Sequence, residues 1–259
     1  LQAVIATGIA NTDHGISDLK VSRHNVTECD YAKRPHGVNG GGDLFTAILA
    51  CWLTSGHDLN AAFAAASSTR LIVHAAAASS DCDLLADAQV GIMGWNGTSA
   101  SWLGFDLDQR LCDAMTTRFA VPAISAVLAI NELLETLGCH RIAMVTPYLD
   151  DIQARILSQY GDAGYECVAE RHTGESVNYA FAEITSSEIE RLIREVATDG
   201  PDAIIVMCTN MRAAPLVDRL EEETGILIID SLAAYVWKAL RLGGINTARI
   251  TGWGRLFSH

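Results

Sequence analysis

The sequence contains no run of about 18 uncharged apolar residues, the length at which a segment becomes a candidate membrane-spanning helix. It also has little positive charge, since 18 lysines and arginines stand against 31 acidic residues and leave a net charge of −13. A negatively charged protein surface has no electrostatic attraction to nucleic acids or to anionic membrane surfaces. We therefore expect no nucleic acid and no membrane as partner, and a small molecule as ligand.

Cysteine pairs at zinc-binding spacing are also missing. The seven cysteines are an odd number and include no C-x-x-C pair, which fits neither a disulfide framework nor a zinc site. We expect all seven to be thiols in a reducing compartment, the cytoplasm, and we expect no metal centre. His140 and His172 have no metal-ligand spacing around them and are expected to be surface residues.

Short apolar runs alternate with amphipathic segments from about residue 89 onwards. The apolar runs predict strands at residues 90–93, 122–124, 141–145, 166–169, 203–207 and 226–229. The amphipathic segments predict a first helix up to about residue 118 and further helices at 127–137, 150–163, 186–197, 215–224 and 231–242. A polar stretch at 171–181 predicts a long loop or lid. This alternation is typical of an α/β fold with mainly parallel sheets.

The most apolar run, Ala203 to Met207, has no polar alternation and predicts a strand buried on both faces. Cys208 follows this strand, and Pro215 marks the start of the next helix. Backbone N–H groups in a strand-to-helix turn favour a thiolate, so Cys208 is a candidate for chemistry. The alternative is a buried, inert cysteine at a strand end.

A strand–helix unit recurs in this region. Val121 to Ser125 and the helix after it match Ile226 to Ser231 and its helix. Ser125 and the pair Asp230-Ser231 are expected as helix caps, with the two serines 106 residues apart, and Gly97 and Cys208 are 111 residues apart. The repeat predicts two similar lobes whose turns converge on one cleft, unless two ordinary strand–helix units match by coincidence.

Four short motifs carry a resemblance to a known family: Gly97-Thr98-Ser99, Thr146 to Asp151, Cys208-Thr209-Asn210 and Gly254 to Phe257. Over about residues 86–259 the sequence resembles the aspartate/glutamate racemase superfamily, in its arylmalonate decarboxylase and maleate isomerase branch. The resemblance implies an α/β fold of two pseudo-symmetric Rossmann-like lobes, the second at about 126–235, around a site that uses no cofactor. The region at about 86–259 does not include the opening strands of the first lobe of this superfamily, so we expect that lobe to be incomplete.

The resemblance also implies roles for individual residues. Cys208 would be catalytic, and the substrate would be bound by Gly97, Thr98, Ser99, Tyr148, Thr209 and Asn210. Racemases and maleate isomerases of this superfamily carry a cysteine in each lobe, whereas arylmalonate decarboxylase has glycine in the first lobe. Gly97 and Cys208 follow the decarboxylase pattern, but the triplet at 208–210 departs from it towards the isomerases and racemases.

These residue types suit chemistry at the carbon next to a carboxylate. An enediolate formed there needs hydrogen-bond donors in a dry pocket, which the hydroxyls and N–H groups at 97–99 and Tyr148 can supply. A single thiol exchanges protons on one face only. We therefore expect a decarboxylase-like enzyme in which Cys208 protonates the enediolate of a small carboxylate or dicarboxylate.

Other interpretations remain open. A racemase or a maleate cis–trans isomerase would need another thiol, and Cys112 is the nearest candidate in sequence. Tyr148 could pack its ring and leave its hydroxyl in water, and Thr98 and Ser99 could be helix caps alone. The sequence leaves the oligomeric state open.

Residues 1–88 show a different pattern. Strands are expected at 3–6 and 20–22, and a glycine-rich turn at 40–43 precedes helices expected at 44–53 and 59–78. This segment resembles the C-terminal part of pyridoxal kinases in the ribokinase-like superfamily. The resemblance implies an anion hole and a catalytic base, formed by Gly40, Gly41, Gly42 and Asp43. A plain turn before a helix is the alternative.

The junction near residues 84–90 has no linker of Gly, Ser or Pro type. We infer a chimera in which a kinase-like α/β fragment at 1–88 precedes a racemase-like region at 89–259. A pyridoxal kinase fragment or an inactive chimera is therefore a further functional alternative.

Overall fold

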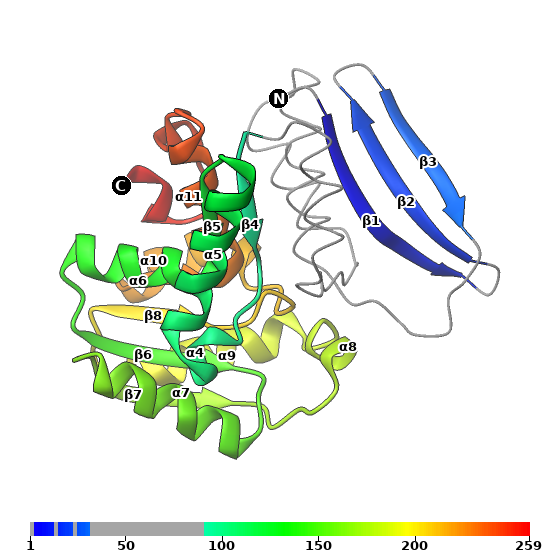
Figure 1. Ribbon diagram of the computed structural model, residues 1–259. Helices are drawn as coiled ribbons and strands as arrows, with labels where there is room; N and C mark the ends of the chain where they lie inside the picture. Colours follow the sequence, from blue (N-terminus) through cyan, green and yellow to red (C-terminus); the bar gives the residue numbers. More distant parts are fainter. Residues whose placement is uncertain (1–2, 13–14, 23–24, 32–90) are drawn as a thin grey trace. The chain divides into compact units, whose positions relative to one another are not determined.

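The computed structural model in Figure 1 describes residues 3–12, 15–22, 25–31 and 91–259. The chain forms two compact units, one of residues 1–95 with 114–123 and one of residues 96–113 with 124–259. The boundary predicted at residue 88 and the second lobe predicted at about 126–235 stay predictions. No helix in the described part of the chain is long and apolar enough to cross a membrane.

The first unit contains a three-stranded antiparallel sheet in the order β1-β2-β3. Its strands are β1 (Ala3–Thr12), β2 (Gly15–Ser22) and β3 (Asn25–Tyr31). The strands expected at 3–6 and 20–22 are confirmed and are longer than expected. Strand β3 is a finding that the sequence did not suggest, because its Asn, Glu and Asp residues are depleted in strands. The turn at 40–43 and the helices expected at 44–53 and 59–78 lie outside the described residues.

In residues 91–125, the observed elements are shifted or divided relative to the predicted ones. The strand expected at 90–93 is β4 (Met93–Trp95), which forms a two-stranded sheet with β5 (Ala123–Ser125). The expectation of one helix up to about residue 118 is wrong. The structure has α4 (Ala100–Leu103) and α5 (Phe105–Phe119), separated by Gly104. Gly104 has a φ of 124°, which a helix cannot accommodate.

A four-stranded parallel sheet in the order β7-β6-β8-β9 forms the centre of the second unit. Its strands are β6 (Arg141–Thr146), β7 (Glu166–His172), β8 (Ala203–Val206) and β9 (Leu227–Asp230). Every residue of the central strand β8 is buried, as expected inside a parallel sheet, and every residue of β9, at the sheet edge, is buried as well. The predicted α/β fold with parallel strands is therefore confirmed.

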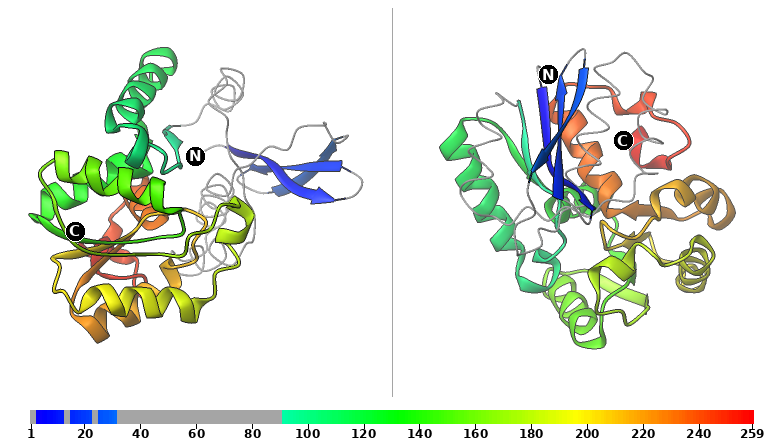
Figure 2. Two further views of the ribbon diagram at one scale, coloured as in Figure 1. Left: turned by 90° about the horizontal axis from the view of Figure 1, so that it is seen from below. Right: turned by 90° about the vertical axis from the view of Figure 1, so that its right-hand side faces the viewer.

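Helices cover both faces of this sheet, and α7 and α9 lie on opposite faces (Figure 2). The helices are α6 (Ala126–Leu137), α7 (Asp150–Asp162), α8 (Asn178–Phe181), α9 (Ser186–Ala197), α10 (Val217–Thr224) and α11 (Ser231–Leu242). Three short 3₁₀ helices are η1 (Ala214–Leu216), η2 (Thr247–Arg249) and η3 (Arg255–Ser258). The loop expected at 171–181 is shorter than expected, because β7 extends to residue 172 and α8 begins at residue 178.

The helices that belong to the sequence repeat begin at matching caps. Ser125 Oγ accepts a hydrogen bond from Leu128 N at 3.1 Å and caps α6. The cap of α11 is Asp230, whose Oδ1 accepts from Ala233 N at 2.9 Å. Of the expected pair Asp230-Ser231, Asp230 is the cap, so the two caps lie 105 residues apart instead of the 106 expected for the two serines. Both helices have 12 residues, and they pack against each other.

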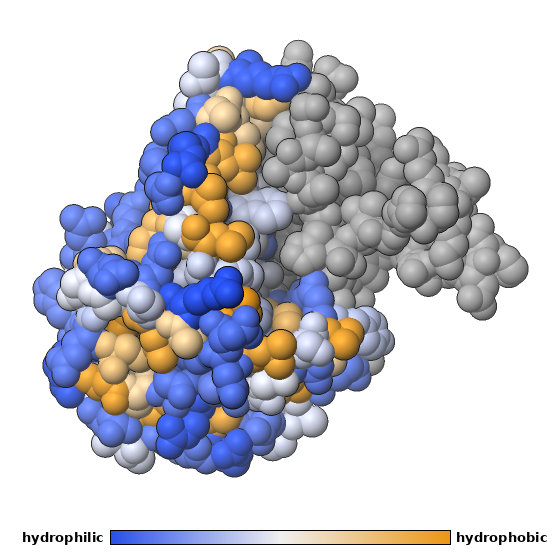
Figure 3. Space-filling model, turned by 60° about the horizontal axis from the view of Figure 1, so that its bottom comes forward, coloured by the Kyte–Doolittle hydropathy of each residue, from blue (hydrophilic) through white to orange (hydrophobic). Residues whose placement is uncertain are grey.

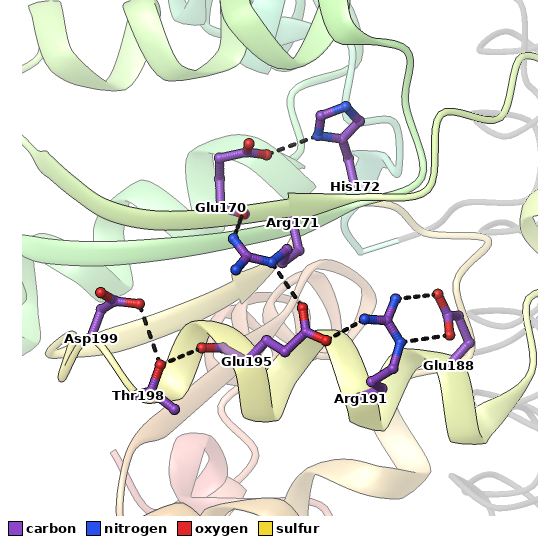
Figure 4. A network of polar contacts seen from close by, with 8 residues as sticks. All are labelled: Glu170, Arg171, His172, Glu188, Arg191, Glu195, Thr198 and Asp199. Carbon is purple, nitrogen blue, oxygen red and sulfur yellow. Dashed lines mark hydrogen bonds and ion pairs between the residues drawn. The ribbon is translucent and has the colours of Figure 1, made fainter.

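An ion-pair network joins α9 to the edge strand β7 (Figure 4). Arg171 on β7 donates to Glu195 Oε2 at 2.8 Å, and Arg191 pairs with both Glu195 and Glu188 on α9. Exposed ion pairs contribute little one by one. The buried apolar face of α9 therefore contributes most of the stability of its packing on the sheet.

Candidate active site

Two neighbouring strands deliver the central residues of the site. Strands β6 and β8 are adjacent and parallel, so their carboxyl ends lie at the same edge of the sheet. Tyr148 follows the end of β6 by two residues, and Cys208 follows the end of β8 by two residues. This edge is where open α/β sheets place their ligand sites.

Tyr148 connects three parts of the chain through its ring and its hydroxyl. The ring makes edge-to-face contacts with Trp102 of α4 at 5.0 Å and with Phe181 of α8 at 5.5 Å between centroids. The hydroxyl shares a hydrogen bond of 2.7 Å with Thr98 Oγ1 and lies near enough to the Cys208 sulfur to act on the pKa of that thiol. A tyrosine with its hydroxyl in water is therefore excluded. Burial raises the pKa of Tyr148 well above its usual value, so the hydroxyl keeps its proton and can donate it in a hydrogen bond.

The turn at residues 97–99 brings a second hydroxyl to this point. Gly97 and Thr98 are buried, and Ser99 is partly exposed. Ser99 occupies the cap position of α4 but makes no side-chain capping bond, and Thr98 Oγ1 bonds Tyr148 instead. Helix capping alone therefore does not account for either hydroxyl.

Cys208 is buried, with 3% of its surface exposed. Asn210 N–H donates to its sulfur at 3.4 Å, whereas Met211 N–H donates to the Cys208 carbonyl oxygen at 3.2 Å. The N–H groups of Asn210 and Met211 and the Tyr148 hydroxyl act to lower the pKa of the thiol. These donors favour the thiolate, but the loss of water around the sulfur outweighs them and raises the pKa of Cys208 to about 11. The predicted preference for a thiolate is therefore wrong, and the thiol is protonated at neutral pH.

The rest of the turn after β8 attaches to α8. Thr209 and Asn210 are half-buried. Asn210 Nδ2 donates to Asn178 Oδ1 at 2.6 Å, at the start of α8. Thus the backbone of Asn210 contacts the thiol, while its side chain holds the segment that follows β7.

That segment, residues 173–181, is tied to the loop that carries Tyr148. Thr173 N donates to Thr146 O at 3.2 Å, and Glu175 N donates to Pro147 O at 2.8 Å. Val177 and Tyr179 are more than half exposed, at 57% and 66%. Figure 3 shows apolar side chains interspersed with hydrophilic ones over the described surface of this view. The predicted loop or lid is therefore an anchored segment that packs Phe181 on Tyr148.

Asp230 belongs to this region, although the sequence analysis treated it only as part of a helix cap. It ends β9, the neighbour of β8, and is 1% exposed. Burial raises the pKa of Asp230 to about 7, and its charge contributes to the raised pKa of Cys208. The signal available in the sequence was a carboxylate that follows three apolar strand residues directly.

In the described part of the chain, Cys112 makes no hydrogen bond with Thr98, Tyr148 or Cys208, and the predicted kinase-type residues are not among the described residues. Cys112 is a buried thiol on α5, and burial together with the charges of Asp108 and Asp113 raises its pKa to about 12. Gly40, Gly41, Gly42 and Asp43, the predicted kinase-type residues, lie outside the described part of the chain.

The two histidines have no metal-binding surroundings. His140 is exposed. His172 bonds Glu170 and Asp150, each at 2.9 Å, which raises its pKa despite the opposing effect of burial (Figure 4 shows the Glu170 contact). Within the described ranges no group of three or more His, Cys, Asp or Glu residues could hold a metal ion.

Comparison with known proteins identifies relatives of this chain. The chain is 28% identical over 165 residues to arylmalonate decarboxylase of Bordetella bronchiseptica, a match that covers 62% of this chain and 68% of the relative. It is 25% identical over 181 residues to a maleate isomerase of Pseudomonas putida, covering 67% of this chain and 72% of the relative.

Solved structures agree with these matches. A maleate isomerase of Pseudomonas putida superposes with a TM-score of 0.62 at 27% identity, over 69% of this chain and 76% of that chain. A crystal structure of arylmalonate decarboxylase also has a TM-score of 0.62, at 24% identity, over 68% of this chain and 79% of that chain. The predicted resemblance to the branch of these two enzymes is confirmed, whereas the resemblance of residues 1–88 to pyridoxal kinase stays a prediction.

The sequence model of one family, described as arylmalonate decarboxylase, matches residues 70–257. This match includes every motif from Gly97 to Phe257 that carried the resemblance. Because it spans more than half of the chain, the chain belongs to the arylmalonate decarboxylase family.

Proposed function

We propose that this chain is a cofactor-independent enzyme that acts at the carbon α to a carboxylate and decarboxylates a malonate-type substrate, with Cys208 as proton donor. The observation that carries the proposal is the buried contact chain from Thr98 through Tyr148 to Cys208, in which two hydroxyls meet one thiol. Family membership and the match to an arylmalonate decarboxylase support the proposal. The substrate class is a small carboxylate or dicarboxylate.

The proposed reaction assigns a role to each group. The bond between Cα and one carboxyl carbon breaks, CO₂ leaves, and the electron pair forms an enediolate with the remaining carboxylate. The hydroxyls of Thr98, Ser99 and Tyr148 and the N–H groups of the turn at 97–99 stabilise the enediolate charge. The Cys208 S–H then transfers its proton to Cα, and solvent returns a proton to the sulfur.

The environment of Cys208 suits a donor. With a pKa of about 11 the sulfur holds its proton at neutral pH and is ready to give it to an enediolate, which is a stronger base. The N–H groups of Asn210 and Met211 and the Tyr148 hydroxyl then stabilise the thiolate that the transfer leaves behind. Burial therefore keeps the proton on the sulfur before the transfer, and the donors stabilise the thiolate after it.

The alternative function is that of an aspartate/glutamate racemase or a maleate cis–trans isomerase. The triplet at 208–210 and the match to maleate isomerase support it. Either reaction needs a second acid or a nucleophile on the opposite face of the substrate. Gly97 offers no side chain for this role, and the charges that act on Cys112 come from its own helix rather than from the site. We therefore rank this function second.

Purified protein incubated with phenylmalonate and with methylmalonate in D₂O tests the proposal. We expect CO₂ release and one deuterium at Cα of each product molecule. Cys208→Ala is expected to lower the rate by about 10²–10⁴-fold, the usual contribution of a general acid. Cys167→Ala removes a partly buried thiol from β7 and serves as the matched control, which should keep the parent rate.

Three results separate the functions. Decarboxylation that is unchanged in Cys208→Ala would exclude the proposed role of the thiol. Fumarate formed from maleate, or deuterium in recovered aspartate or glutamate without CO₂ release, would favour the isomerase or racemase. A cooperative thermal melt with no shift and no turnover across small dicarboxylates would indicate an inactive chimera.

A further inference from the structure

Two buried polar atoms at the N-terminus of α11 lack a partner among the described residues. Asp230 uses Oδ1 to cap the helix, but its Oδ2 makes no hydrogen bond. Ser231 Oγ, on the next residue, also makes none. The two residues are 1% and 0% exposed, so bulk water does not reach them.

Such atoms require an explanation. Most buried side-chain polar atoms in folded proteins have a hydrogen-bond partner, because an unpaired one loses its interaction with water and gains nothing in return. Here a carboxylate oxygen and a hydroxyl on adjacent residues, Asp230 and Ser231, are both unpaired. Unpaired buried polar atoms in a native structure point to a catalytic role or to a bound group that supplies the missing hydrogen bonds.

The pair lies next to the candidate site. Asp230 is the register partner of Val206, and Cys208 follows Val206 by two residues along the adjacent strand end. The charge of Asp230 also acts on the Cys208 sulfur. A substrate held for proton transfer from Cys208 therefore has its α-carbon near the pair.

The chemistry of the two atoms selects the group that fits. A hydroxyl is both donor and acceptor, so it can donate to Asp230 Oδ2 and accept from Ser231 Oγ. A methyl group would satisfy neither atom, and a further carboxylate would face the negative charge of Asp230. One hydroxyl thus satisfies both atoms at once.

We propose that Asp230 and Ser231 form a subsite for a hydroxyl on the α-carbon of the substrate, so that the preferred substrates are hydroxyl-bearing malonates. This inference rests on the proposed function, because it places the substrate α-carbon beside Cys208. A hydrogen bond to a charged group changes affinity by about 10- to 100-fold, and we expect a preference of that size for hydroxyl over methyl.

Calorimetric titration with hydroxymalonate and methylmalonate tests the subsite, because these ligands differ only in the hydroxyl and methyl groups. The full chain carrying Cys208→Ala is used so that neither ligand is consumed. We expect hydroxymalonate to bind at least 10-fold more tightly. Adding Ser231→Ala, or Asp230→Ser, which retains a capping side chain, should reduce this ratio to about twofold or less.

Asp108→Asn is the matched control. Asp108 is another buried aspartate with an unpaired Oδ2, but it lies on α5 and bonds Ser125. This variant should keep the parent preference. Thermal melts of all variants establish that they are folded, and the two subsite variants provide independent tests if one of them is not.

The outcomes separate the two proposals. If both malonates bind with equal affinity, the subsite is wrong and the proposed function stands. If hydroxymalonate is preferred to the same degree in every variant, other residues recognise the hydroxyl and the subsite is again wrong. If neither malonate binds, the proposed function fails and the subsite fails with it.

Discussion

Replacing Tyr148 with phenylalanine removes one oxygen atom from the candidate site and keeps the aromatic packing. The ring retains its contacts with Trp102 and Phe181, at 5.0 and 5.5 Å. Thr98 Oγ1 loses its hydrogen-bond partner at 2.7 Å, and Cys208 loses the nearby hydroxyl that lowers the pKa of its thiol. The variant therefore tests the hydroxyl separately from the ring.

The structure gives the size of the expected effects. Leaving the buried Thr98 hydroxyl unpaired should lower the free energy of unfolding by about 1–3 kcal/mol. The loss of one donor to the enediolate should lower kcat by about 10²–10³-fold. Because the Tyr148 hydroxyl favours the thiolate, its removal should also raise the pKa of Cys208 above its value of about 11.

Tyr160→Phe is a control of the same chemistry. Tyr160 is a buried tyrosine of α7 whose hydroxyl donates to Asn131 Oδ1 at 3.1 Å and whose ring contacts Phe105 at 5.1 Å. This variant should lose a comparable amount of stability and keep the parent rate. Urea unfolding measures the stability, and chromatography of the phenylmalonate product measures the rate.

The comparison between Tyr148→Phe and Tyr160→Phe tests whether the Tyr148 hydroxyl acts in the reaction or only stabilises the fold. A Tyr148→Phe protein that decarboxylates phenylmalonate at the parent rate would show that the hydroxyl does not act on the substrate or on Cys208. Equal loss of rate in Tyr160→Phe would show that the effect comes from general destabilisation.

Three further predictions concern stability. Gly254→Ala should destabilise the protein by about 2 kcal/mol in urea unfolding, because Gly254 has a φ of 90° and an added Cβ would clash with Val217 Cγ1. Gly138→Ala, at a φ of 66° with nothing within 4 Å, should lose less, and equal losses would contradict the steric argument. Thr185→Ala should lower the free energy of unfolding by about 1 kcal/mol, because Thr185 Oγ1 caps α9 by accepting from Glu188 N at 3.2 Å; an unchanged value would exclude the cap as a contributor. The raised pKa of Asp230, about 7 against 3.8, gives a stabilising contribution that is complete below pH 3.8 and is lost as the pH rises through 7. Asp230→Asn retains a capping side chain but cannot ionise, so its loss of stability from pH 5 to pH 8 should be smaller than the parent's by about 2–3 kcal/mol, and parallel pH curves would refute this.

The parallel sheet of the second unit could be predicted from local patterns. Its strands are short apolar runs, and its helices begin at capping residues such as Ser125. The division between α4 and α5 could not be predicted, because the residues after Gly104 continue a helical pattern and only the positive φ of that glycine shows the break. The sequence leaves the α11 cap within the pair Asp230-Ser231 because both are good caps, and the backbone geometry selects Asp230.

The candidate site was predictable in its members but not in its electrostatics. The strand order places Tyr148 and Cys208 at one edge, and the sequence motifs indicated both residues. The pKa of Cys208 depends on a balance between bonding N–H groups and burial by distant parts of the chain. Local sequence shows the first contribution only, which explains why the predicted thiolate was wrong.

That balance also bears on the direction of proton transfer. At pH 7 a thiol with a pKa of about 11 is ionised in only about 1 molecule in 10⁴, which makes it a poor base for removing an α-proton. A racemase would need a thiolate with a pKa near the working pH and a second group on the opposite face, and at the position where the family pattern has the other cysteine this chain has Gly97. Loss of CO₂ creates the base by itself, so the site needs to supply only a proton and the donors that stabilise the enediolate. Burial of Cys208 beneath the hydroxyls of Tyr148 and Thr98 therefore favours decarboxylation over racemisation.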